Sequence, residues 1–194
     1  IRALKQVAGV KDVSSSVVGF QLAPRLNAAG RMEDAALGVE LLLEDDMVRA
    51  LNTARYLDQC NRERRELEKE TLKEAEAAVA SLSKDHTHAI VLGGKGWHPG
   101  VIGIVASRLV DRCCRPTILV AMDGDSGKGS CRSIRGFHLY RGLQACSEHL
   151  TAFGGHEMAA GLSLSNDQLS SFAEAMEAHA RAELNDDDLI PKLL

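Results

Sequence analysis

The sequence has few aromatic residues, few prolines and no long apolar run. Only 4% of its 194 residues are aromatic, with a single Trp, while 45% are hydrophobic. A core of this composition must therefore be mainly aliphatic. No stretch approaches the roughly 20 apolar residues that cross a bilayer, so we expect no membrane span and no membrane partner.

A secretory leader and a disulfide framework are also missing. Residues 1–5 are followed by no apolar segment typical of a signal peptide, and they lack an initiator Met. We therefore expect the chain to be part of a longer protein. The five cysteines include the adjacent pair Cys113–Cys114 and no CxxC motif, which disfavours both disulfides and a structural zinc site. Free thiols in a reducing cytosol, and thus a cytoplasmic protein, are the expectation.

Positive charge is scarce overall but unevenly distributed. The formal net charge is −4, which by itself argues against a nucleic-acid-binding protein. Residues 85–150, however, contain eight Lys and Arg against five Asp and Glu, whereas residues 151–194 contain two against eight. A nearly neutral total can therefore conceal a basic surface within residues 85–150, although a solvated acidic tail accounts for half of the asymmetry.

The N-terminal part has a helical pattern with one interruption. Residues 1–8 and 14–20 predict two short helices, the second with Ser side chains available for capping. Pro24 should break this pattern, so we expect residues 21–31 to form a polar loop. Residues 34–43 then return to helix.

A single long helix is predicted for residues 45–82. This segment contains no Pro and no Gly, and its apolar residues recur at helical spacing near both ends. Its centre, residues 61–66, is entirely polar. At 1.5 Å per residue the helix would be roughly 55 Å long, and a helix with a polar centre commonly bridges two bodies. The domain boundary is therefore placed here.

The pattern changes after residue 82. Short β-branched runs alternate with helical segments, which is typical of an α/β layer with a buried sheet. The predicted strands are 89–92, 116–122, 128–134 and 159–164, and the predicted helices are 101–111, 139–149 and 167–183. Residues 186–191 have the character of an exit linker.

Two segments of this second part have the composition of phosphate-binding sites. Residues 93–100 are rich in glycine, include His98 and stand between a strand and a helix, so they predict either an anion site or an ordinary turn. In the second segment, Ser130 and Arg132 share one face of a strand because side chains alternate. A hydroxyl beside a guanidinium suits a phosphate, but a solvated basic strand face is an equal alternative.

Two further segments combine polar side chains with small residues. Gly154, Gly155 and His156 form a glycine-rich bend, in which a buried His would be either a core residue or a ligand contact. Residues 24–32 form the expected loop, whose Asn27 and Arg31 could contact nucleic acid or cap helices.

Two acidic segments resemble metal ligands only superficially. These are residues 85–88, Asp-His-Thr-His, and residues 123–125, Asp-Gly-Asp. Mg²⁺ and Mn²⁺ prefer clustered carboxylates, and neither segment has other acidic residues nearby in the sequence. Polar turn residues explain both, so we expect no metal ligands in this chain.

Four motifs taken together resemble the RecJ single-stranded-DNA-specific exonucleases, of the DHH/DHHA1 phosphoesterase family. They are residues 26–31 (Leu-Asn-Ala-Ala-Gly-Arg), residues 96–108 (beginning Gly-Trp-His-Pro-Gly), residues 128–134 (Lys-Gly-Ser-x-Arg-Ser-Ile) and residues 153–161 (Phe-Gly-Gly-His-x-x-Ala-Ala-Gly). The motifs follow the family's order from about residue 1 to about residue 184.

The resemblance implies a fold and an activity. Such enzymes degrade single-stranded DNA from the 5′ end in repair and recombination, with two Mn²⁺ or Mg²⁺ ions held by a DHH domain. Residues 1–45 would be the end of that domain, residues 46–83 the connecting helix, residues 84–184 a DHHA1 domain with a mixed sheet flanked by helices, and residues 185–194 a linker. Single-strand-binding protein and helicase partners are implied by resemblance only.

Only substrate contacts carry over, because the family's metal-binding motifs are absent from this sequence. Ser130 and Arg132 would grip a DNA phosphate, Gly154, Gly155 and His156 would face the scissile phosphate, and Asn27 and Arg31 would line the channel; His98 is a further candidate. No catalytic residue is assigned, and the chain alone should be inactive. The alternatives are a related oligonucleotide or nucleoside-bisphosphate phosphodiesterase or phosphatase, and a non-catalytic nucleic-acid-binding module.

Overall fold

The computed structural model describes residues 1–82 and 87–191. It divides into two compact units, residues 1–67 and residues 68–194, and the division falls inside one long helix. Each unit has its own hydrophobic core. No helix in the described parts of the chain is long and apolar enough to cross a membrane.

The first unit is entirely helical. Its core is formed by small and aliphatic side chains from successive helices, including Leu4, Leu41 and Leu57, each at most 1% exposed. Its elements are α1 (Arg2–Ala8), α2 (Ser15–Val17), a π-helical segment (Val18–Leu22), α3 (Ala23–Met32), α4 (Ala36–Leu43) and the first part of α5 (Met47–Ala80).

The prediction of a loop at residues 21–31 is wrong, because these residues are helical. Pro24 lies in the first turn of α3, directly after the π-helical segment, and the helical run is unbroken from residue 15 to residue 32. Proline has no N–H to donate, and its ring interferes with the preceding turn. A π-helical segment is a place where the regular hydrogen-bond ladder of a helix changes locally, and the helix continues through Pro24 with such a segment just before it.

The single long helix is confirmed, as α5 runs without interruption from Met47 to Ala80. Asp46 caps its start, since its carboxylate accepts hydrogen bonds from the Val48 and Arg49 amides at 2.8 and 3.0 Å. These bonds, the one from Arg49 foremost, lower the pKa of Asp46. The polar centre at residues 61–66 is mostly exposed, although Asn61 is buried.

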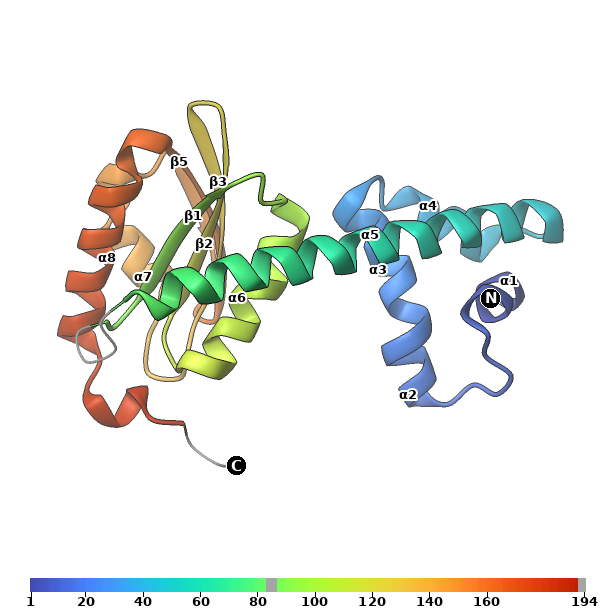
Figure 1. Ribbon diagram of the computed structural model, residues 1–194, viewed down its shortest axis with the longest axis horizontal. Helices are drawn as coiled ribbons and strands as arrows, with labels where there is room; N and C mark the ends of the chain where they lie inside the picture. The colour runs from blue at the N-terminus through green and yellow to red at the C-terminus, as the bar shows by residue number, and fades with distance from the viewer. Residues whose placement is uncertain (83–86, 192–194) are drawn as a thin grey trace. The chain divides into compact units, whose positions relative to one another are not determined.

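The second unit is built around a five-stranded mixed sheet with helices on both faces (Figure 1). The strand order is β1-β2-β3-β5-β4; β1 and β2 are parallel and all other pairs are antiparallel. The strands are β1 (Ile90–Lys95), β2 (Thr117–Asp123), β3 (Ser126–Arg132), β4 (Ala152–Gly155) and β5 (Ala159–Ser165). The predicted α/β class is confirmed.

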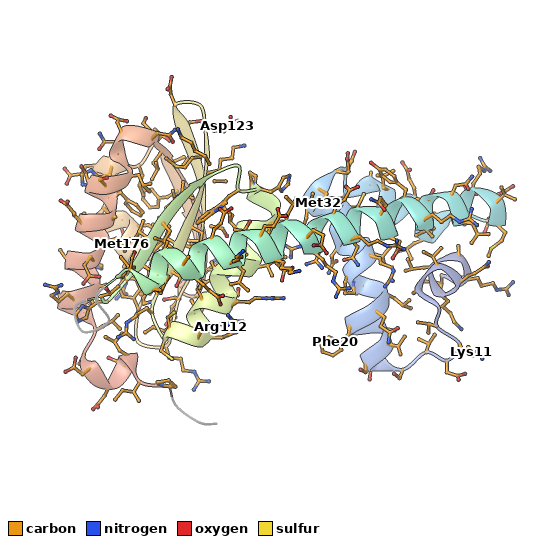
Figure 2. The ribbon with its side chains drawn as sticks, in the orientation of Figure 1. Lys11, Phe20, Met32, Arg112, Asp123 and Met176 are labelled. Carbon is orange, nitrogen blue, oxygen red and sulfur yellow. The ribbon has the colours of Figure 1, made fainter. Side chains whose placement is uncertain are left out.

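The two faces of the sheet are covered differently. Helices α7 (Leu139–Ala145) and α8 (Leu169–Glu183) pack on one face over a large apolar core, which includes Phe172 and Met176 (Figure 2). Helix α6 (Pro99–Cys113) covers β2 and β3 on the other face. Figure 1 shows α6 and α8 on opposite sides of the sheet.

One strand and the ends of several elements differ from the sequence prediction. The sequence predicts a glycine-rich bend at Gly154 and Gly155, which are poor strand formers, but backbone pairing with β5 makes them the strand β4. The predicted helix 139–149 ends at Ala145 and continues as a 3₁₀ turn at residues 147–149. The supposed linker contains a 3₁₀ turn, Asp186–Leu189, whose Leu189 is buried in the core of the unit.

Candidate functional site

Strand β3 presents different side chains to its two sides. Its core side consists of Gly127, Gly129 and the buried Cys131, while Lys128, Ser130 and Arg132 point to the α6 side. The pair predicted to share one face does so: Arg132 Nη1 donates to Ser130 Oγ at 3.2 Å and to the Cys131 carbonyl at 2.8 Å. The hydroxyl and guanidinium therefore form one donor group.

Gly103 of α6 makes room for this pair. A Cβ at this position would lie 2.8 Å from Ser130 Oγ and 3.0 Å from Arg132 Nη2. Only a glycine therefore allows the helix to approach the two side chains without displacing them. Gly103 was not among the predicted site residues, although it lies in the glycine-containing segment 96–108.

Arg132 differs in its partners from Arg108, Arg112 and Arg115 of the same unit. Arg108 and Arg112 of α6 form ion pairs with Glu68 and Glu76 of α5 (Arg112 is labelled in Figure 2). Arg115 donates to the carbonyl oxygens of three residues, Thr87, Cys113 and Leu189. Arg132 is half-buried, yet no carboxylate within residues 1–82 and 87–191 forms an ion pair with it. Its positive charge is thus available to an anion.

Beyond Arg132 the same face of the sheet is lined by small residues. Ser130 pairs with Gly161 of β5, and Gly161 pairs with Gly154 of β4, so all three lie in one row across the sheet. Gly154 and Gly161 are exposed, and a Cβ at Gly154 would meet no atom within 4 Å. A ligand backbone can therefore approach the sheet closely beside the Ser130–Arg132 pair.

The β4–β5 turn places His156 at the Arg132 end of this row. Its amide donates to the Ala159 carbonyl at 2.8 Å, and Ala159 pairs with Arg132. Gly155 has a φ of 148°, and a Cβ there would overlap the Ala160 backbone, so this turn requires glycine. Of the two alternatives for His156, the core position is excluded, since His156 is exposed in the turn between β4 and β5.

His98 lines a separate cleft of about 320 Å³ together with Lys128 of β3. It is the N-cap of α6, and its Nδ1 accepts the Gly100 amide at 3.1 Å. Its neighbour Trp97 packs its ring over Gly94 and donates from Nε1 to Glu74 of α5 at 2.8 Å. These contacts hold the loop before α6 in place, so that His98 has a defined position.

The cysteine inside β3 has no part in this chemistry. Burial raises the pKa of the Cys131 thiol to about 12, against a smaller opposing effect of the Arg132 charge. The thiol therefore stays protonated at neutral pH, and thiols without thiolate character are poor nucleophiles.

Asn27 and Arg31 belong to the first unit, where they lie one helical turn apart on α3. Both are exposed and line a surface hollow of about 500 Å³ with small and apolar residues of α3 and α4. Arg25, in the same segment, instead has a structural role, because it pairs with the buried Asp58 at 2.8 Å.

Among the described residues, no group of three or more His, Cys, Asp or Glu side chains is arranged to hold a metal ion. Asp123 and Asp125 flank the β2–β3 turn, and His88 Nδ1 lies 3.0 Å from Glu177 Oε1. Asp85 and His86 lie outside the described residues. The donor set of the described residues thus does not fit Mg²⁺ or Mn²⁺.

Comparison with known proteins agrees with this architecture. Residues 74–182 match the sequence profile of the DHHA1 domain. The chain belongs to the DHHA1 domain family. The matched segment contains all five strands and almost all of α8, and with them Ser130, Arg132 and the His156 turn.

Relatives of this DHHA1 chain include enzymes named single-stranded-DNA-specific exonuclease RecJ. The Bacillus subtilis protein is 44% identical over 184 residues, which are 94% of this chain and 23% of that protein. Crystal structures of RecJ from Thermus thermophilus in complex with Mg²⁺ and with Mn²⁺ superimpose with TM-scores of 0.84 and 0.83, at 34% and 33% identity. Each covers 95% of this chain, which spans 28% and 27% of those chains.

Proposed function

We propose that this DHHA1 chain is the substrate-binding part of a 5′-to-3′ single-stranded-DNA exonuclease, and that Ser130 and Arg132 hold the 5′ phosphate of the strand. The observation that carries the proposal is the half-buried Arg132, which hydrogen-bonds Ser130 and has no carboxylate partner in the described parts of the chain. A guanidinium can donate two hydrogen bonds to one phosphate, and the hydroxyl adds a third donor.

The small residues beside this pair support a path for the strand. Gly161 and Gly154 leave the sheet face open, so the sugar–phosphate backbone can cross β5 toward His156. Neighbouring strands are about 4.8 Å apart, so β4 lies roughly 10 Å from β3. The terminal phosphate at Arg132 and the scissile phosphate beside Gly154, Gly155 and His156 would therefore occupy separate positions on the sheet.

The proposed binding is led by phosphates and tolerates any base. With few aromatic residues, stacking contributes little, and phosphate contacts carry no sequence information. Asn27 and Arg31 would contact the strand from the first unit. In the complete enzyme, Mg²⁺ or Mn²⁺ held by residues outside this chain would supply the hydrolytic chemistry, so this chain alone should not digest DNA. A cytoplasmic role in repair and recombination, with single-strand-binding protein or helicase partners, completes the proposal.

The test compares two arginines in the complete exonuclease. Arg132→Ala should lower kcat/KM by about ten- to a hundredfold, because a charge-assisted contact contributes roughly 1.5–3 kcal/mol. The loss should be larger on 5′-phosphorylated than on 5′-hydroxyl DNA.

Arg141→Ala is the matched control. Arg141 lies on α7, is exposed, and forms no ion pair with the described residues, so its removal should change kcat/KM little. Melting curves of both variants separate a binding defect from unfolding. Equal losses for Arg132→Ala and Arg141→Ala, or a loss explained by unfolding, would remove the Ser130–Arg132 pair from the site.

A further inference from the structure

We infer that the cleft of His98 and Lys128 is a second phosphate subsite, which takes the outer phosphates of a strand with a 5′ polyphosphate end. The inference rests on the proposed function, which places the sugar-linked phosphate at Ser130 and Arg132. The second subsite would extend the substrate class from monophosphorylated strands to strands that carry a 5′ triphosphate.

The position of Lys128 on β3 is the first observation. Lys128 and Ser130 are alternate residues on the α6 side of the strand, and alternate residues lie about 7 Å apart. The flexible lysine side chain can therefore reach a phosphate attached to one that is held at Ser130. Lys128 is exposed and forms no ion pair with any residue in the described ranges.

The donors that converge in the cleft are the second observation. His98 Nδ1 accepts the Gly100 amide, so in the neutral ring the hydrogen is on Nε2, which remains a donor. Lys128 lines the same cleft of about 320 Å³ and provides an ammonium group. Asp123, labelled near the tip of the β2–β3 hairpin in Figure 2, also lines the cleft, and its charge opposes an anion there.

The direction in which the DNA strand is proposed to run determines which of its phosphates can occupy the cleft. His156 is aligned with Arg132 through Ala159, whereas Lys128 lies beyond Ser130 at the other end of β3. A strand that runs from Ser130 and Arg132 toward His156 therefore leads away from Lys128. A group bound at Lys128 must be attached to the 5′ side of the terminal nucleotide, as the outer phosphates of a 5′ triphosphate are.

The experiment uses the complete exonuclease and strands of one sequence with a 5′ triphosphate or a 5′ monophosphate. Lys128→Ala should lower kcat/KM about tenfold on the triphosphate strand, the loss of one charge-assisted contact, and less than twofold on the monophosphate strand. Lys128→Arg should restore most of the loss. Lys95→Ala is the matched control, since Lys95 is an exposed lysine on β1 that does not line the cleft.

A binding measurement complements the rates. Inorganic triphosphate should inhibit cleavage of the monophosphate strand. Its inhibition constant should be about tenfold higher in Lys128→Ala than in the unmodified enzyme. In Asp123→Asn the inhibition constant should be lower than in the unmodified enzyme, because a negative charge is removed from the cleft. Equal losses on both strands in Lys128→Ala, an unchanged inhibition constant, or failure of the unmodified enzyme to cleave the triphosphate strand would overturn the inference. If Arg132→Ala also leaves cleavage of the monophosphate strand unchanged, the proposed function fails as well; if Arg132→Ala impairs it, only the second subsite fails.

Discussion

The two sides of β3 differ in composition: one side packs in the core, and the other carries the side chains proposed to bind DNA. On the core side, Gly127 and Gly129 have no side chains, and Val120 and Leu162 fill the space above them. On the α6 side, Lys128, Ser130 and Arg132 have polar side chains. We expect changes on the core side to affect folding, and changes on the α6 side to affect the proposed binding of DNA.

The largest effect should come from breaking the core side. Phe172 of α8 is fully buried over the sheet, and truncation of a buried Phe to Ala typically costs about 3–5 kcal/mol. Phe172→Ala should therefore lower the melting temperature strongly, and activity should fall only in proportion to the unfolded fraction. Thermal unfolding together with activity at low temperature tests this; full stability in Phe172→Ala would contradict the packing described.

Gly154 and Gly155 of the edge strand β4 should differ in whether substitution affects stability or DNA binding. Gly155→Ala should destabilise the unit by roughly 1–3 kcal/mol, because its Cβ would overlap the Ala160 backbone at a φ of 148°. Gly154→Ala should leave stability nearly unchanged, because its Cβ meets no atom within 4 Å. Its methyl group would instead stand where the DNA backbone is proposed to pass, and reduce binding.

Denaturant unfolding and single-strand affinity should be measured for both glycine variants. We expect the two variants to differ in opposite ways. Gly155→Ala should have a lower free energy of unfolding, whereas Gly154→Ala should be as stable as the unmodified chain but bind single-stranded DNA more weakly. If Gly154→Ala binds DNA as well as the unmodified chain, the strand does not cross β4 at this point.

A smaller effect is expected at the contact between α6 and β3. Gly103→Ala should stabilise the helix itself slightly, by up to about 1 kcal/mol, but its Cβ would push Ser130 and Arg132 aside. We expect a several-fold loss of kcat/KM without a lower melting temperature. Activity equal to that of the unmodified enzyme would show that the position of these two side chains is not critical.

The long helix and the central strand could be predicted from the sequence, because the local conformational preferences of their residues agree with the tertiary structure. Residues 47–80 contain only residues compatible with a helix, and the β-branched run of β2 is buried on both faces. β4 and the helix through Pro24 could not be predicted in the same way. Gly154 and Gly155 form a strand because β5 pairs with them, and the helix continues through Pro24 with a π-helical segment just before it.

The candidate site was predictable to the extent that it depends on alternation along one strand. Ser130 and Arg132 had to share a face once β3 was a strand, and Lys128 follows by the same rule. The close approach of Gly103 and the lack of a carboxylate partner for Arg132 in the described parts of the chain depend on packing between elements, which no sequence pattern specifies. The exposure of His156 likewise depends on the pairing of β4 with β5, which places it in a turn.

The most direct measurement is the affinity of this chain for single strands that differ only at the 5′ end. The dissociation constants of a 5′-phosphorylated and a 5′-hydroxyl oligonucleotide should be determined for the unmodified chain and for Arg132→Ala, at low and at moderate salt. We expect tighter binding of the phosphorylated strand, a preference that Arg132→Ala abolishes, and affinities that fall as salt rises. Equal affinity for both strands, or a preference that persists in Arg132→Ala, would show that Ser130 and Arg132 do not hold the terminal phosphate.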